Sequence, residues 1–166
     1  MPSRKPKEEM PAKVREQLEN LKFWHPQRRA DAAAMLGQIG GAEVVPALAE
    51  RLRDKHSNVR WHAAQALGNI GHVSGDVPLA KALQDEEPNV RKRAAVSLGM
   101  IGRAIQGKKV EGKEAKALQM VAEHFHEREE PAIIQKVLQA ALKGKITKEN
   151  ARLYVKQLRA LQGSVK

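Results

Sequence analysis

The sequence contains no cysteine and few aromatic residues. Without cysteine, the chain can form no disulfide framework, no thiolate metal site and no cysteine nucleophile. Aromatic residues make up 3% of the chain, whereas hydrophobic residues as a whole make up 42%. The core must therefore consist mainly of alanine, leucine, isoleucine and valine, and the enrichment that is typical of strands is missing. This composition favours closely packed helices.

Long apolar segments are missing as well. No run approaches the roughly 18 apolar residues that a membrane helix needs. Residues 1–9 contain no apolar segment of the kind found in secretory signals. We therefore expect residues 1–9 to form a flexible basic tail, and we expect a cytoplasmic protein without a membrane partner.

The chain has too few acidic residues to balance its basic ones. It contains 30 Lys and Arg against 19 Asp and Glu, which gives a formal net charge of +11 and an isoelectric point near 10.1. Residues 107–166 carry 13 basic and 7 acidic side chains. Such an excess is compatible with binding to nucleic acid or to an acidic protein. Lysine on solvated helix surfaces is the plainer explanation, and the sequence leaves both open.

One stretch of the chain occurs three times, with a period of 31 residues. Residues 59–71 and 90–102 share a Val-Arg pair followed by Ala-Ala-x-x-Leu-Gly-x-Ile-Gly, and residues 28–40 are a third copy. The apolar positions of each copy fall on one face of a helix. Internal similarity at a period of 20–50 residues is the signature of a solenoid.

Each repeat also contains an earlier helical pattern, so that every unit consists of two helices. In the second unit, residues 42–54 form the first predicted helix, and Ser57 is the expected N-cap of the next one. Gly71 ends that helix, and by the same pattern Gly102 ends the corresponding helix of the third unit. A basic connecting loop is predicted over residues 103–111.

The remaining residues repeat the pattern less regularly. Helices are predicted over residues 113–126, from Pro131 onward, and over residues 147–161. The helix from Pro131 is expected to be a fourth second helix, with Gln135, Lys136 and Gln139 on its variable face. We interpret residues 10–162 as one domain, with regular repeats over 25–102 and a degenerate C-terminal cap over 112–161.

The repeated pattern resembles HEAT repeats, and more closely the short HEAT-like repeats of the phycobilisome-lyase type. An Asp, six residues before an Arg that follows Val, precedes the Ala-Ala-x-x-Leu-Gly-x-Ile-Gly segment in residues 54–71 and 85–102. The resemblance implies an all-α fold, a right-handed α-solenoid of about four HEAT-like hairpins and a terminal helix. It also implies that the second helix of each unit lines the concave side.

The resemblance further implies a structural ladder of hydrogen bonds along the turns, formed by Asp54, Arg60, Asp85 and Arg91. Phe23 replaces the Asp of the first unit, and Ile134 replaces the Arg of the last. The ladder is therefore expected only in the middle of the chain.

The positions opposite the buried face differ between copies, whereas the core positions repeat. We predict that these variable positions form the surface that binds a partner, namely Asn58, Trp61, His62, Gln65, Asn69, Asn89, Lys92, Arg93 and Val96. Trp61 is the most informative of them, because its equivalents are Ala30 and Lys92 and an exposed Trp is typical of interface anchors. The alternative is that Trp61 covers neighbouring alanines. Trp24, beside Pro26, is expected to cap the core.

The sequence contains no motif that indicates catalysis. His124 and His126 are two residues apart and would point to different faces of a helix, so they are poorly placed to share a metal ion. Gly68 and Gly71 end a helix and do not open one, so they form no phosphate-binding loop. We expect no enzymatic activity, no metal, no cofactor and no small-molecule substrate.

The function expected from the sequence is that of a non-enzymatic scaffold or adaptor that binds a protein or peptide on the concave helix face. One alternative is a nucleic-acid-binding protein that uses its basic surface. A second alternative, a bilin lyase-like subunit, is implied by the family resemblance alone.

Overall fold

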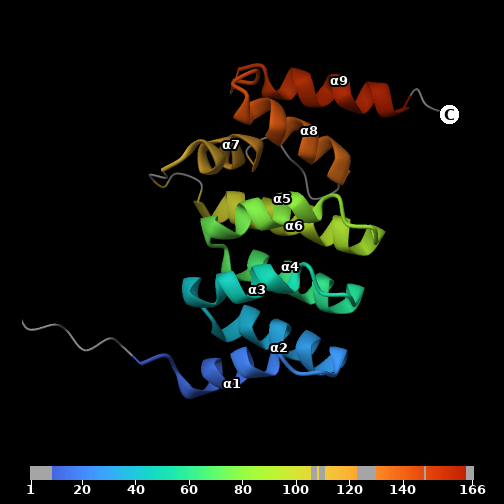
Figure 1. Cartoon of the computed structure of the whole chain (residues 1–166). Helices are drawn as coiled ribbons and strands as arrows, with labels where there is room; N and C mark the ends of the chain where they lie inside the picture. Colours follow the sequence, from blue (N-terminus) through green and yellow to red (C-terminus); the bar gives the residue numbers. More distant parts are fainter. Residues whose placement is uncertain (1–8, 106–107, 109–110, 123–129, 148, 164–166) are drawn as a thin grey trace, which may run out of the picture.

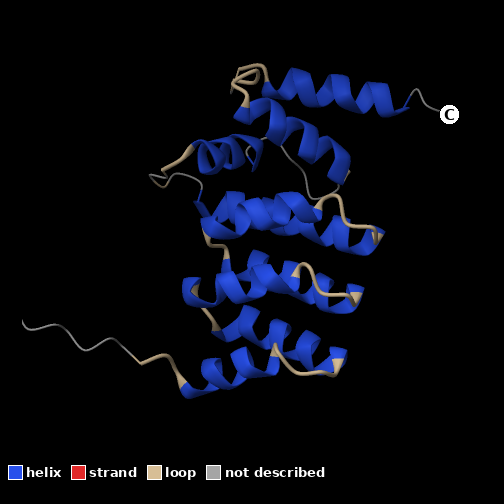
Figure 2. Ribbon diagram, viewed as in Figure 1, coloured by secondary structure: helices blue, strands red, loops and turns tan. Residues whose placement is uncertain are grey.

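The computed structural model describes residues 9–105, 108, 111–122, 130–147 and 149–163. Within these ranges all regular structure is helical (Figure 1; Figure 2). The helices are α1 (Ala12–Asn20), α2 (Pro26–Ile39), α3 (Val45–Arg51), α4 (Ser57–Ile70), α5 (Asp76–Ala82), α6 (Pro88–Ile105), α7 (Lys113–Ala122), α8 (Pro131–Leu142) and α9 (Ala151–Gly163). Short 3-10 turns, Ala42–Val44 and Val73–Gly75, lead into α3 and α5. The predicted all-α fold is confirmed.

The helices stack as hairpins in the order of the sequence. In Figure 1, the pair α1–α2 lies at one end, followed by α3–α4 and then by α5–α6. The most extensive contacts between helices are those of α2 with α4 and of α4 with α6. The second helices of the three units therefore form a continuous layer, as expected for an α-solenoid.

Equivalent apolar residues of the second helices form the centre of the core. Leu36, Leu67 and Leu98 occupy the same position in α2, α4 and α6, and each is at most 1% exposed. Burial of a leucine side chain contributes about 1.5–3 kcal/mol to stability. The adjacent Ala-Ala pairs are buried as well, and their small side chains let the helices come close together.

Two glycines allow the second helices to approach until their backbones touch. A Cβ atom at Gly37 would lie 2.6 Å from the Cα atom of Ala66, and a Cβ atom at Gly68 would lie 2.6 Å from the Oγ atom of Ser97. The equivalent Gly99 is different, because a Cβ atom there would meet only the end of Arg103, at 3.6 Å. The first two glycines are therefore required by packing.

The helix ends predicted at Ser57 and Gly102 differ from the structure. Ser57 is the first residue of α4 and not its cap, since His56 occupies the N-cap position and makes no side-chain capping bond. Gly71 ends α4 with a φ of 67°, a left-handed conformation that favours glycine, as predicted. Helix α6 continues past Gly102 to Ile105, which is buried one turn after Ile101. Residues 103–105 are thus helical and do not belong to the loop that was predicted over residues 103–111.

Buried arginines connect consecutive turns on one edge of the solenoid. The guanidinium of Arg60 donates to both carboxylate oxygens of Asp85, at 2.8 and 2.9 Å. It also donates to the backbone oxygens of Asp54 and Lys55 in its own unit. Arg91 donates to the backbone oxygens of Asp85 and Glu86. Each arginine closes its own turn, and Arg60 also binds the turn of the following unit.

The ladder begins one unit earlier than the family resemblance implies. Arg29 donates to both carboxylate oxygens of Asp54 at 2.8 Å and to the backbone oxygens of Phe23 and Trp24. The expectation of a ladder restricted to the middle is wrong here, because only the backbone of residue 23 is needed and a Phe supplies it as well as an Asp. At the C-terminal end of the repeats, Ile134 of α8 is buried in the hydrophobic core.

Desolvation and pairing act in opposite directions on the pKa of the Asp54 carboxyl group. Burial raises the pKa of Asp54, but the hydrogen bonds from Arg29 and from the backbone N–H of His56 outweigh it. The net result is a pKa of Asp54 below its usual value. The ionised carboxylate is therefore stabilised in the folded protein.

The last three helices do not continue the regular stack. Helix α7 packs on α6, α8 packs on α7, and α8 has only a small contact with α6. Gln135 and Gln139 of α8 line a hollow together with Val77 and Lys81 of α5. The prediction that α8 extends the variable stripe of the second helices is therefore wrong.

The expected N-terminal tail, residues 1–9, lies outside the described residues except for Glu9. None of the helices in the described part of the chain is long and apolar enough to cross a membrane.

Replacing Gly68 by alanine should destabilise the protein, because the added methyl group overlaps Ser97. Overpacking of this kind costs about 1–3 kcal/mol. The free energy of unfolding, measured in urea by far-ultraviolet circular dichroism, reports the loss. Gly99→Ala is the matched control: its methyl group has room, and alanine stabilises a helix by up to about 1 kcal/mol relative to glycine. Equal effects of the two substitutions would contradict the packing role of Gly68.

Asp54→Asn should lower the free energy of unfolding by about 3 kcal/mol at neutral pH, because the buried Arg29 loses its charged partner. Denaturant unfolding at a series of pH values tests this. The folded-state pKa of Asp54 is lowered, so its contribution is present above the unfolded-state value of about 3.9 and is lost as the pH falls through the folded-state value. The deficit of the variant should therefore shrink in acid.

Glu86→Gln is the control for the ladder. The Glu86 carboxylate also accepts a hydrogen bond from Arg60, at 3.0 Å, but its side chain is 80% exposed. Exposed pairs contribute about 0–1 kcal/mol, so this substitution should have a much smaller effect. A loss as large as that of Asp54→Asn would show that burial does not set the strength of the ladder.

Candidate interaction surface

The variable residues of the second helices lie on a surface that runs across three helices, here called the α2–α4–α6 surface. It consists of the solvent-facing residues of α2, α4 and α6. The nine residues predicted to bind a partner all keep some exposure. Asn58, Asn69, Asn89 and Lys92 are exposed, and Trp61, His62, Gln65, Arg93 and Val96 are half-buried.

Trp61 forms the centre of a small cluster on this surface. The guanidinium carbon of Arg93, from α6, lies 4.5 Å from the centre of the Trp61 ring. The ring of His62 meets Trp61 edge-on, with 4.8 Å between ring centres. Trp61 is therefore neither a fully exposed anchor nor a buried lid, since an arginine of the next unit covers part of its ring.

Two polar atoms of this cluster are buried without a partner. Among the described residues, nothing forms a hydrogen bond with Nδ1 of His62 or with Nε of Arg93. An unsatisfied buried polar group costs about 1–3 kcal/mol. Such a cost is common at sites where the missing partner belongs to another molecule or to water.

Burial lowers the pKa of His62, and the positive charge of Arg93 lowers it further. Asp31 and a hydrogen bond with Gln65 act in the opposite direction and offset part of the effect. A histidine normally titrates near pH 6.5, so His62 is neutral at pH 7. The cluster then carries one positive charge, that of Arg93.

A hollow of about 450 Å³ lies beside the cluster, between the first turns of α4 and α6. Asn58, Trp61 and His62 line it from α4, and Asn89 and the preceding Glu87 line it from the next unit. Four of the nine predicted residues are thus brought together around one hollow. Asn69 and Val96 lie further along the same helices and do not line it.

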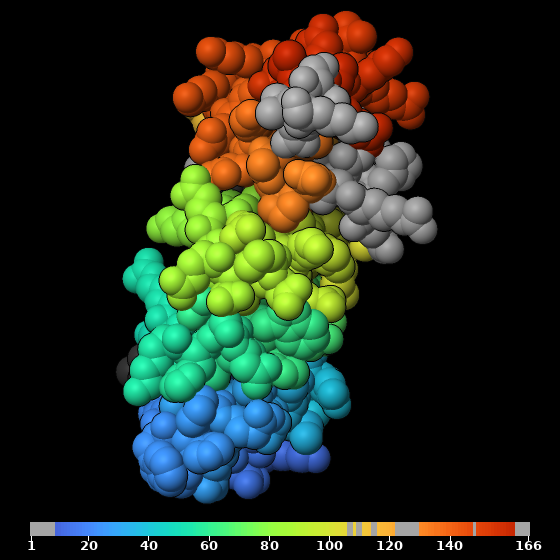
Figure 3. Space-filling view, turned by 90° about the vertical axis from the view of Figure 1, so that its right-hand side faces the viewer, coloured from blue at the N-terminus to red at the C-terminus, as the bar shows by residue number. Residues whose placement is uncertain are grey.

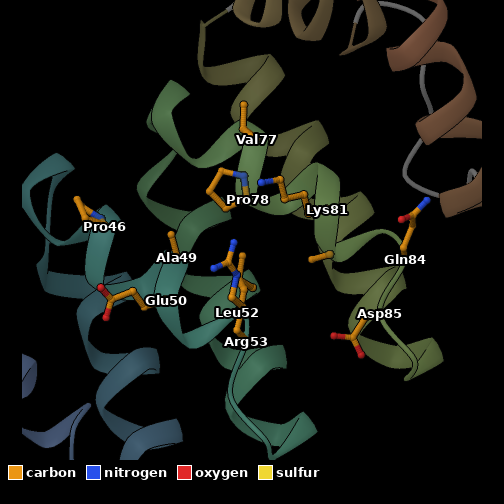
Figure 4. A pocket seen from close by; sticks show the side chains of 11 residues that line it. Pro46, Ala49, Glu50, Leu52, Arg53, Val77, Pro78, Lys81, Gln84 and Asp85 are labelled. Atoms are coloured by element: carbon orange, nitrogen blue, oxygen red, sulfur yellow. The ribbon is translucent and has the colours of Figure 1, made fainter.

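The opposite side of the solenoid carries another hollow, of about 370 Å³, between α3 and α5 (Figure 4). Glu50 and Arg53 line it on one side, and Lys81 and Asp85 line it on the other. Its walls thus carry charges of both signs in similar number. No aromatic residue lines it, which distinguishes it from the hollow beside Trp61.

Trp24 lies elsewhere than expected. It is 76% exposed and so does not cap the core. Its ring contacts the neighbouring rings of Phe23 and His25, at centre distances of 5.9 and 5.2 Å. The turn between α1 and α2 holds its backbone through Arg29, which leaves the side chain outside. An aromatic residue in a turn position that carries Lys55 and Glu86 in the other units was the available signal for exposure.

The described residues include no group of three or more metal-binding side chains. The histidines considered as metal ligands, His124 and His126, lie outside the described residues.

Comparison with known proteins agrees with this architecture. Residues 14–78 match the family described as HEAT repeats. Over 99% of its length, the chain resembles 76% of a chain in the complex of CpcE and CpcF of phycocyanin lyase from Nostoc sp. PCC7120, with a TM-score of 0.54 and 19% identity. At this identity the likeness concerns the fold. No curated protein matches the chain in sequence.

The chain is thus an all-α solenoid built from helical hairpins. More specifically, residues 14–78, from α1 to the start of α5, match HEAT repeats, in agreement with the pattern of residues 54–71.

Removing the guanidinium above Trp61 should expose the indole ring. In a Trp24→Phe background, where Trp61 is the single tryptophan, Arg93→Ala should shift the fluorescence emission to longer wavelength and increase quenching by acrylamide. Arg28→Ala is the matched control, since Arg28 covers Phe23 at 4.0 Å in the same manner but far from Trp61 in sequence. If both substitutions leave the quenching unchanged, Arg93 does not cover Trp61 in solution.

Proposed function

We propose that the protein is a non-enzymatic interaction module that binds a protein partner on the α2–α4–α6 surface. The observation that carries this proposal is the cluster of Trp61, His62 and Arg93. These residues stand at positions where other units have different side chains, so the fold does not require them. They nevertheless make specific contacts and leave two buried polar atoms unsatisfied.

The chemistry of the cluster suits binding better than catalysis. Tryptophan and arginine are the residue types most enriched where interfaces gain their free energy. Among the described residues, no carboxylate or hydroxyl group forms a hydrogen bond with the neutral His62. The hollow beside it is open and contains a single carboxylate, that of Glu87. This arrangement lacks the paired acid and base that general acid–base catalysis uses.

The similar solenoid from Nostoc was solved in a complex of two named components, CpcE and CpcF. That likeness supports a protein as the partner of the present chain. It also makes a subunit of a lyase-like complex the second candidate function. The two candidates share the need for a protein partner and differ in whether the assembled complex acts on a chromophore.

Nucleic acid is less well suited to this surface. Asp31 and Glu87 are exposed on or beside it, and both would repel a phosphate backbone. Phosphate contacts would make affinity fall steeply with salt concentration, which provides a simple way to recognise this alternative.

The proposal predicts that Trp61→Ala combined with Arg93→Glu abolishes capture of the native partner. Loss of an anchor worth 2 kcal/mol or more weakens binding by about 30-fold. Tagged wild-type and variant proteins are expressed in the native cell, partners are quantified by mass spectrometry, and affinity for the identified partner is then measured. Circular dichroism verifies that the variant is folded.

Trp24→Ala combined with Arg53→Glu is the matched control, because it removes an exposed tryptophan and reverses an exposed arginine away from the cluster. It should leave capture unchanged. Equal capture by the folded Trp61/Arg93 variant and by the wild type would rule out the proposed surface. Capture that disappears after nuclease treatment would point to nucleic acid instead.

A further inference from the structure

Three amide side chains occupy the same position in the three second helices. Gln27, Asn58 and Asn89 are spaced by 31 residues, lie in the first turns of α2, α4 and α6, and are all exposed. The Nδ2 atom of Asn58 lies 3.4 Å from Oε1 of Gln27. Asn58 and Asn89 line one hollow. The three amides therefore form a continuous row, here called the amide row, that neither the core nor the ladder uses.

The amide row lies at the edge where the second helices begin. Those ends are on the right in Figure 1, and Figure 3 looks onto this edge, where the units follow one another in sequence order. A molecule lying along this row would run parallel to the axis of the solenoid and would meet one amide in each unit.

The spacing of the row suits an extended polypeptide. Packed helices lie about 8–10 Å apart, and an extended chain advances about 3.3 Å per residue. One amide per helix thus corresponds to every third residue of an extended segment. A side-chain amide both donates and accepts hydrogen bonds, so it can pair with the backbone N–H and C=O of any residue. Recognition of this kind is independent of the bound sequence.

Side chains next to the row supply selectivity, because their charge changes along the solenoid. Asp31, His62 and Arg93 are also equivalent residues of α2, α4 and α6. The carboxylate of Asp31 accepts a hydrogen bond from Gln27 at 2.9 Å. Within the described part of the chain, no carboxylate forms a salt bridge with Arg93, and Lys92 beside it is exposed. The surface is thus acidic at α2, neutral at α4 and basic at α6.

We propose that the α2–α4–α6 surface binds an extended acidic segment of a partner, with the backbone of the segment on the amide row. An acidic side chain of the segment pairs with Arg93 and Lys92 at α6, and a polar, uncharged side chain enters the hollow beside Trp61, whose walls are mostly polar. Opposite Asp31, a second acidic side chain is disfavoured. Glu87, at the rim of the hollow, disfavours an acid there as well. This inference rests on the proposed function and specifies the kind of partner.

A library of random linear dodecapeptides displayed on phage, panned on the full chain, tests the inference. The wild-type protein should enrich peptides that contain an acidic residue about three positions from a polar, uncharged one. Lys92→Glu combined with Arg93→Glu should replace the acidic preference by a basic one. A reversal of this kind cannot result from unfolding, which would abolish enrichment altogether.

The amide row is tested separately by Asn58→Ala combined with Asn89→Ala. Affinity for synthetic copies of the enriched peptides should fall by about tenfold, since several hydrogen bonds are lost, while the acidic preference should persist. Gln84→Ala combined with Gln139→Ala is the control, because it removes two exposed amides that line other hollows, the one between α3 and α5 and the one between α5 and α8. The control should bind the peptides like the wild type.

Two outcomes would overturn the inference: no enrichment on the wild-type protein, or enriched peptides whose binding is unaffected by both pairs of substitutions. One combination of results would overturn the inference but not the proposed function. In it, no peptide binds the wild-type protein, but the variant with Trp61→Ala and Arg93→Glu no longer captures the native partner. The partner would then present a folded surface. If neither peptide binding nor partner capture depends on these residues, the proposed function fails as well.

Discussion

The close approach of the second helices is the constraint on which the other features depend. At Gly37 and Gly68 there is no space for a single methyl group between neighbouring helices. This contact sets how far one unit is displaced from the next, and so it places residues that are 31 positions apart side by side. The arginine ladder, the amide row and the contact of Arg93 with Trp61 all require that alignment. Each of them joins residues of successive units across a distance that only tight packing provides.

The repeated part of the fold could be predicted from the sequence, because its evidence is local and occurs three times. Apolar spacing placed the helices, and the repeated Asp and Arg led to the pairing of Arg60 with Asp85. The participation of Arg29 was not predicted, since an Arg precedes it where the other copies have Val. The offset of α8 was not predictable either, because it depends on contacts between helices that no local pattern records.

The candidate surface, too, could be predicted from the sequence only in part. Which residues face solvent could be inferred from variation among the copies, and all nine predicted residues do keep some exposure. How they contact one another could not be inferred. The position of Arg93 over the Trp61 ring depends on the rotamers of two long side chains, and the unsatisfied nitrogen of His62 depends on what packs around it. A repeat sequence gives the positions of side chains, whereas their partners emerge only when the units are stacked.

The arginine ladder also bears on how the molecule comes apart. Each Arg–Asp bond joins an arginine of one unit to a carboxylate of the next. The stability of each unit therefore depends on its neighbour. Fraying from the α1 end would leave Asp54 in water, where an ionised carboxylate is well solvated. Loss of the later units would instead remove Asp85 and leave Arg60 bound only to the backbone oxygens of its own turn. The ladder thereby gives the solenoid a direction, and the two ends of a chemically uniform repeat should differ in how readily they unravel.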